Sequence, residues 1–162
     1  MWWFLAYDFA GSFTPMNMVE MDLVEIQITN DAPHQVIILQ EKEGTRHFPI
    51  YIGNYEVTVL DSAIRDVTHE RPLTHDLALN IVDGLEGKLT GVVVDELRGN
   101  TFIGKLLVKN GHGEVTHIDT RPSDAIILAV KRRVPIYVEE EVLASTNIEE
   151  NESGNDDFES GD

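Results

Sequence analysis

Residues 35–67 read QVIILQEKEGTRHFPIYIGNYEVTVLDSAIRDV, and this stretch decides the fold. Its first part predicts two strands, Gln35–Glu41 and His47–Ile52, separated by a short Glu-Gly turn. The apolar residues then recur at helical spacing, which predicts a helix over Asn54–Val67 with Asn54 as its N-cap. Two strands and a helix therefore follow one another directly along the chain.

The same two periodicities assign the elements on either side of this stretch. Alternating apolar residues predict one strand before it and four after it, and helical spacing predicts two more helices and one further turn. The predicted strands are Val19–Thr29, Gly87–Leu97, Thr101–Lys109, Glu114–Thr120 and Pro135–Val138. The predicted helices are Thr74–Gly84 and Pro122–Arg132, with the additional turn at Glu139–Leu143.

A shift of 68 positions aligns the chain with itself. Gln35–Glu41 falls on Ile103–Lys109, and residues 50–56 fall on residues 118–124. A chance match of short strands is one explanation, but the order strand-strand-strand-helix matches without gaps, which favours duplication. Neither half could bury its apolar face alone. The expected fold is therefore α+β: a duplicated β-β-β-α unit forming a barrel-like, mostly antiparallel sheet with packed helices.

The two ends of the chain differ in composition from this repeated unit. Residues 1–17 begin with the apolar run Met1–Tyr7, which is too short to span a membrane and lacks the basic region of a signal peptide. Residues 146–162 are polar and acidic, and they are expected to form a disordered tail. We expect one domain, over residues 18–145.

The chain is strongly acidic, with a formal net charge of −17, and it contains no cysteine. The lack of cysteine excludes disulfides and thiolate metal sites, and favours a reducing, cytoplasmic location. The negative charge counts against an extended nucleic-acid-binding surface, although not against a few arginines in a cleft. Because a small sheet-rich domain often covers its edges by self-association, a homo-oligomer (dimer or trimer) is expected.

Two short motifs each place an arginine directly before a helix, with a hydroxyl and a carboxylate in the first turn. They are RPLTHD at residues 71–76 and RPSD at residues 121–124. The free N–H groups and the dipole of a helix N-terminus attract anions, and arginine can grip a phosphate with two hydrogen bonds. The candidate substrate-binding residues are Arg71, Thr74, Arg121 and Ser123.

The same motifs supply the candidates for acid–base and metal chemistry, His75, Asp76 and Asp124. Histidine titrates near neutral pH, so His75 is the candidate for proton transfer. Glu56 occupies the repeat position of Asp124, and together with Asp76 these carboxylates could hold Mg²⁺ or Mn²⁺. A purely structural interpretation stays open: the hydroxyls would cap helices, and the carboxylates would pair with helix ends or arginines.

Several separated motifs, in a fixed order, carry a family resemblance. They are FPIYIG at residues 48–53 followed by Glu56, RPLTHDL at residues 71–77, RPSDAI at residues 121–126 and PIYV at residues 135–138. Together they resemble the bifunctional nuclease domain family of bacteria and plants, over about Val19 to Leu143. The resemblance implies a duplicated unit on a barrel-like sheet and an activity on both DNA and RNA, but it implies no catalytic mechanism.

The resulting hypothesis is a non-specific nuclease that hydrolyses phosphodiester bonds of DNA and RNA. Arg71 and Arg121 would hold phosphates, His75 would transfer a proton, and Asp76 and Asp124 would orient it or bind the metal ion. The alternative is a non-catalytic regulatory module that binds a small anion or a protein. Arginines that line an open cleft with bound phosphate or sulfate would favour the enzyme. Arginines that are buried and paired internally with Asp or Glu would exclude it.

Overall fold

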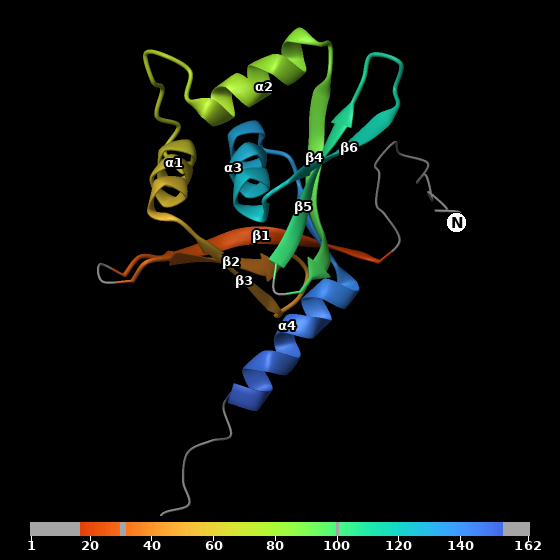
Figure 1. Ribbon diagram of the computed structural model, residues 1–162. Helices are drawn as coiled ribbons and strands as arrows, with labels where there is room; N and C mark the ends of the chain where they lie inside the picture. Colours follow the sequence, from red (N-terminus) through yellow and green to blue (C-terminus); the bar gives the residue numbers. More distant parts are fainter. Residues whose placement is uncertain (1–16, 30–31, 100, 154–162) are drawn as a thin grey trace, which may run out of the picture.

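The computed structural model describes residues 17–29, 32–99 and 101–153. Three strands and a helix occur twice along it, as the ribbon shows (Figure 1). The strands are β1 Met18–Gln27, β2 Gln35–Glu41, β3 His47–Ile52, β4 Lys88–Arg98, β5 Thr101–Lys109, β6 Val115–Thr120 and β7 Ile136–Glu139. The helices are α1 Asn54–Ile64, α2 Thr74–Gly84, α3 Pro122–Arg132 and α4 Glu140–Ser153.

The strands form one seven-stranded sheet in the order β3-β2-β1-β7-β4-β5-β6. Neighbouring strands run antiparallel except β4 and β7, which are parallel. Strand β7 joins the two halves of the sheet, because it pairs with β1 on one side and with β4 on the other. The predicted mixed fold with a mostly antiparallel sheet is confirmed.

The sheet is strongly curved but open, so the prediction of a barrel-like sheet is wrong as regards closure. Within the described ranges, β3 and β6 each pair with a single neighbour, β2 and β5. Even so, Phe48 of β3 meets Phe102 of β5 edge to face, with ring centroids 5.0 Å apart. Four strands stand between β3 and β5 in the sheet. The usual twist of neighbouring strands therefore curls the sheet around a core without joining its edges.

The two halves correspond element by element. The bounds of β3 and α1 recur 68 residues later as the bounds of β6 and α3. The offset proposed from the sequence therefore superimposes real strands and helices. Duplication as the origin of this arrangement stays a prediction.

Helix α3 lies in the middle of the molecule, with α1 and α2 beside it and the sheet around it (Figure 1). Its residues 125–129 are all buried, and they belong to one core cluster with residues from both halves of the sheet. Each large apolar side chain buried in this way stabilises the fold by about 1.5–3 kcal/mol. The start of α3 is therefore held firmly by the packing of the turns that follow it.

The carboxyl end of the domain and the end of α1 differ from the sequence-based expectation. Helix α1 ends at Ile64 rather than Val67, because Asp66 adopts a left-handed backbone conformation with φ 52°. Helix α4 continues to Ser153, beyond the single turn expected, and its buried Val142 and Leu143 anchor it to the fold. The sequence predicted a tail without regular structure from residue 146 onward, whereas the backbone is helical as far as Ser153. Residues 1–16 and 154–162 lie outside the described residues.

No helix in the described part of the chain combines the length and the apolar character that crossing a membrane requires.

Candidate functional site

The first turns of α1, α2 and α3 supply the polar side chains of the candidate site. Each helix follows an N-cap residue with extended backbone, and none of these residues caps the helix with its side chain. The N-cap residues are Gly53, Leu73 and Arg121. The residues that the sequence suggested as caps lie inside the first turns: they are Asn54, Thr74 and Ser123. Asn54 instead accepts a hydrogen bond from Gln35, with the two side-chain atoms 2.9 Å apart.

Asp124 is the centre of a cluster formed by Glu56, His75, Arg121 and Asp124, hereafter the Asp124 cluster. Nε of Arg121 donates to Oδ2 of Asp124 at 2.7 Å, and Nη2 donates to Oδ1 at 3.1 Å. Nη2 also lies 3.1 Å from Oε1 of Glu56. Nε2 of His75 lies 2.9 Å from Oδ1 of Asp124. Asp124 therefore joins His75 of α2 to Arg121 at the start of α3, and Arg121 extends the cluster to Glu56 of α1.

His75 is the buried member of the cluster, with 6% of its surface exposed. A carboxylate only accepts hydrogen bonds, so Nε2 of His75 carries the hydrogen that Asp124 receives. The other ring nitrogen, Nδ1, is buried and has no hydrogen-bond partner among the described residues. The imidazole therefore fixes Asp124 from the inside of the molecule, whereas Arg121, with 66% of its side chain exposed, faces solvent.

The electrostatics of the cluster keep its central carboxylate ionised. Burial alone would raise the pKa of Asp124, but the hydrogen bonds from Arg121 and His75 outweigh it and hold the pKa below its usual value. The hydrogen bond to Asp124 in turn raises the pKa of the Arg121 guanidinium. The cluster thus presents a fixed carboxylate beside a permanent cation.

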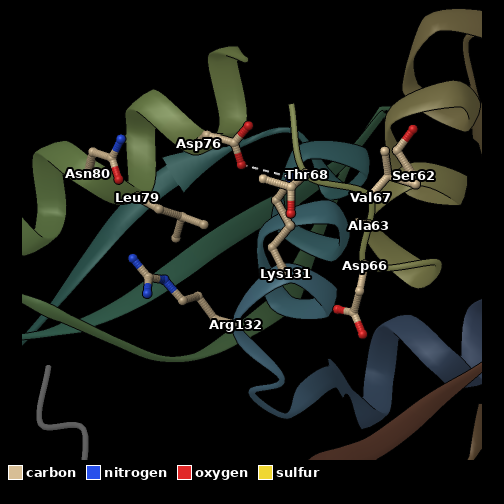
Figure 2. Close-up of a pocket in the computed structure, with 10 residues that line it drawn as sticks. All are labelled: Ser62, Ala63, Asp66, Val67, Thr68, Asp76, Leu79, Asn80, Lys131 and Arg132. Atoms are coloured by element: carbon tan, nitrogen blue, oxygen red, sulfur yellow. Dashed lines mark hydrogen bonds and ion pairs between the residues drawn. The ribbon is translucent and has the colours of Figure 1, made fainter. Parts of the chain in front are cut away.

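Asp76, the neighbour of His75, points to a different place. Its Oδ1 accepts a hydrogen bond from Lys131 of α3 at 2.7 Å, and its Oδ2 accepts one from the backbone N–H of Leu73 at 3.0 Å. The hydrogen bond from Lys131 is the main cause that lowers the pKa of Asp76. Asp76 and Lys131 line a polar cavity of about 320 Å³, shown in Figure 2. The other lining residues are Ser62, Ala63, Asp66, Val67, Thr68, Leu79, Asn80 and Arg132.

The two predicted phosphate-binding arginines do not share this cavity. Neither Arg71 nor Arg121 is among its lining residues. Arg71 is exposed in the loop before α2, and Arg121 pairs with carboxylates at the start of α3 and α1. Thr74 is exposed and Ser123 is buried. The structure thus groups the predicted residues of α3 with His75 and Glu56, but not with Asp76 or Arg71.

The three carboxylates predicted to hold Mg²⁺ or Mn²⁺ do not form one ligand set. Glu56 and Asp124 share Arg121 as their cation, whereas Asp76 is bound to Lys131. Across the described residues, no three His, Asp or Glu side chains are arranged to hold a metal ion. The residues therefore do not fit the predicted three-carboxylate ion site in this conformation.

Sequence reasoning missed the cations at the end of α3. The chain has one run of adjacent Lys or Arg residues, which consists of Lys131, Arg132 and Arg133. This run was the feature of the sequence that could have pointed to them. The sequence pattern predicted only that a helix ends at Arg132, and cations are common at that end of a helix because they complement its dipole.

Gly104 of β5 sets the position at which α3 begins. A methyl group on Gly104 would come within 3.1 Å of the Pro122 nitrogen and of the Thr120 carbonyl oxygen. Both are backbone atoms, so β5 and the start of α3 would have to separate. We expect Gly104→Ala to lower the free energy of unfolding by about 1–3 kcal/mol, measured by urea denaturation.

The matched control for this substitution is Gly84→Ala at the end of α2, where an added methyl group meets nothing within 4 Å. We expect this control to be as stable as the parent or slightly more stable, because alanine loses less conformational entropy in a helix. Equal stability of the two variants would contradict the close approach of β5 to α3.

Comparison with known proteins places these residues in a family context. The sequence profile described as the bifunctional nuclease domain matches residues 37–151, which include the whole Asp124 cluster and the cavity. An uncharacterized protein of Mycobacterium tuberculosis is 34% identical over 131 residues, covering 81% of this chain and 77% of that protein.

Two plant proteins named as bifunctional nucleases are also similar. Bifunctional nuclease 2 of Oryza sativa subsp. japonica is 31% identical over 124 residues, covering 75% of this chain and 38% of that protein. Bifunctional nuclease 1 of Arabidopsis thaliana is 31% identical over 126 residues, covering 76% of this chain and 39% of that protein. This chain therefore corresponds to one part of each plant protein.

Proposed function

The chain belongs to the bifunctional nuclease domain family, and from this premise we propose that it is a nuclease that hydrolyses phosphodiester bonds of DNA and RNA. The observation that carries the proposal is the Asp124 cluster, in which an exposed arginine lies beside a fixed, ionised carboxylate. Hydrolysis of a phosphodiester needs both features: a cation for the phosphoryl oxygens and a group that receives the proton of water.

Arg121 is the proposed phosphate ligand. Its guanidinium is permanently charged and mostly exposed, and a phosphoryl oxygen could approach it from the solvent side. Such a contact would compensate the negative charge that develops on the phosphoryl oxygens in the transition state. Arg71, Thr74 and Ser123 remain proposed substrate contacts on the strength of the motifs alone.

Asp124 is the proposed proton acceptor. The oxygen of a water molecule would form a bond to phosphorus while its proton moves to the Asp124 carboxylate, and the bond from phosphorus to the leaving sugar oxygen would break. The same proton would then pass to that leaving oxygen. His75 would act through Asp124, because its Nε2–H fixes the carboxylate and its ring is buried. Asp76 would hold the first turn of α2 in place through Lys131.

The test is an assay of the purified chain on single-stranded DNA and single-stranded RNA, with and without EDTA. We expect the parent to cleave both substrates. We expect an Arg121→Ala, His75→Ala double variant to cleave neither of them. Cleavage that survives in the double variant would come from a contaminating nuclease. Failure of the parent to cleave either substrate, also with added Mg²⁺ or Mn²⁺, would refute the proposal.

A second candidate function is a non-catalytic module that binds a small anion or a protein. The observation that favours it is the internal pairing of Arg121, whose guanidinium already contacts both Asp124 and Glu56. Binding of inorganic phosphate or an oligonucleotide without any cleavage in the same assay would select this candidate. The homo-oligomer and the cytoplasmic location stay predictions under either function.

A further inference from the structure

Three consecutive cations end helix α3, and each one pairs with an acidic residue from another segment. The pairs are Lys131–Asp76, Arg132–Asp83 and Arg133–Asp66. One role of these pairs is structural, since they tie α2 and the end of α1 to α3 and complement the α3 dipole. This structural role of the ion pairs does not explain the cavity that is lined by Lys131 and Arg132.

The three ion pairs differ in how deeply they are buried, and therefore in how strongly each one is expected to stabilise the fold. The Lys131 side chain is only 12% exposed, and its contact with Asp76 is part of the packed interface between α2 and α3. In contrast, Asp83 is 51% exposed and Asp66 is 73% exposed. Exposed ion pairs of this kind contribute little to stability and are screened by salt. A phosphate could therefore replace the carboxylate of Asp83 on Arg132 at small cost.

The cavity beside these pairs has the size and the chemistry for one phosphate and its sugar. Its volume of about 320 Å³ is at the lower end of the range for ligand pockets. Lys131 and Arg132 extend from α3 toward α2 along its wall, as Figure 2 shows. The uncharged hydrogen-bonding side chains of Ser62, Thr68 and Asn80 also line the cavity. Its two carboxylates are already paired with cations, Asp76 with Lys131 and Asp66 with Arg133.

The cavity also adjoins the Asp124 cluster through the backbone of α2. His75 reaches the cluster, and the next residue, Asp76, lines the cavity. Arg132 pairs with Asp83 near the other end of α2, so a strand held at Arg132 would have to run along α2 to reach the turn that carries His75. The run of cations is also the only place in this acidic chain where Lys or Arg residues are adjacent.

We propose that this cavity is a subsite for a backbone phosphate of a single-stranded nucleic acid. Arg132 would give up its ion pair with Asp83 and bind the phosphate instead. The proposal rests on the proposed nuclease function for the identity of the ligand. In a chain with net charge −17, such a local site would supply the attraction that the rest of the surface does not.

The experiment measures binding of a short, fluorescein-labelled phosphorothioate oligothymidylate, which resists hydrolysis, by fluorescence anisotropy at several salt concentrations. Arg132→Gln should weaken binding about tenfold, because a charge-assisted hydrogen bond is lost. It should also reduce the slope of log affinity against log salt by about 0.7, the value for one phosphate contact on a single strand. Asp83→Asn should tighten binding roughly two- to fivefold, because Arg132 no longer has a competing carboxylate.

The matched control is Arg98→Gln in β4, which removes one charge from an exposed pair with Glu96, outside the cavity. We expect its affinity to equal that of the parent, and thermal unfolding of each variant checks that it is folded. Equal affinity of Arg132→Gln, Asp83→Asn and Arg98→Gln would overturn the subsite. A parent that does not bind the oligonucleotide at low salt would overturn it as well. If binding follows the expected pattern but the protein cleaves no substrate, the proposed subsite would be supported and the proposed nuclease activity would be refuted.

Discussion

Asp124→Asn is expected to lower kcat/KM for cleavage of single-stranded DNA by about two to four orders of magnitude, the usual contribution of a positioned acid or base. The substitution keeps the size of the side chain but removes the negative charge between Arg121 and His75. The amide neither accepts a proton from water nor holds Arg121 in the same orientation. The measurement is a steady-state cleavage assay, with kcat and KM determined separately.

The control for this variant is Asp119→Asn in β6, an exposed carboxylate of the same type five residues earlier. It should cleave at the rate of the parent. If Asp124→Asn changed KM alone and left kcat intact, Asp124 would only position Arg121 for substrate binding, and its role as proton acceptor would be wrong.

Asp124 also makes folding sensitive to acid. Its pKa is below the usual value in the folded protein, so the unfolded chain takes up a proton at higher pH than the folded chain. The stability that this carboxylate contributes is therefore present above pH about 4 and is lost as the pH falls from there through its folded pKa. Denaturation curves of Asp124→Asn should show a weaker dependence on pH in this range than those of the parent.

Phe48→Ala is expected to lower the free energy of unfolding by about 3–5 kcal/mol, the usual cost of removing a fully buried phenylalanine. The side chain is completely buried, and its ring meets Phe102 from the other half of the sheet. About 0.5–1.5 kcal/mol of the loss belongs to that aromatic contact. Urea denaturation monitored by circular dichroism measures the effect.

Tyr51→Ala provides the comparison within the same strand. Tyr51 lies three residues further along β3 but is 73% exposed, so its truncation should change stability by no more than about 0.5 kcal/mol. A loss as large as that of Phe48→Ala would mean that the exposed face of β3 contributes as much to stability as its buried face, and the expected difference between the two faces would be wrong.

Strand and helix bounds followed from the sequence wherever periodicity and turn residues agreed. Residues 47–52 and 122–132 are cases in point, since a Gly or a Pro marks one end of each element. Whether the sheet closes could not be predicted from the sequence, because closure depends on hydrogen bonds between two edge strands. A pattern of apolar residues carries no information on whether those edges meet. The length of α4 was missed because its second half has no apolar periodicity.

The candidate site was predictable in part, for a similar reason. Repeat alignment singled out Glu56 beside Asp124, and Arg121 now joins the two. Asp76 was grouped with them wrongly, because successive residues of a helix point about 100° apart. His75 therefore faces Asp124 while Asp76 faces Lys131.

The place of β7 between β1 and β4 bears on how the protein is made. The strand that joins the two halves of the sheet consists of Ile136–Glu139, near the carboxyl end. A ribosome has therefore synthesised all six other strands before the residues that unite them emerge. Until then β1 and β4 each offer an unpaired edge, which is the kind of surface that chaperones protect from aggregation.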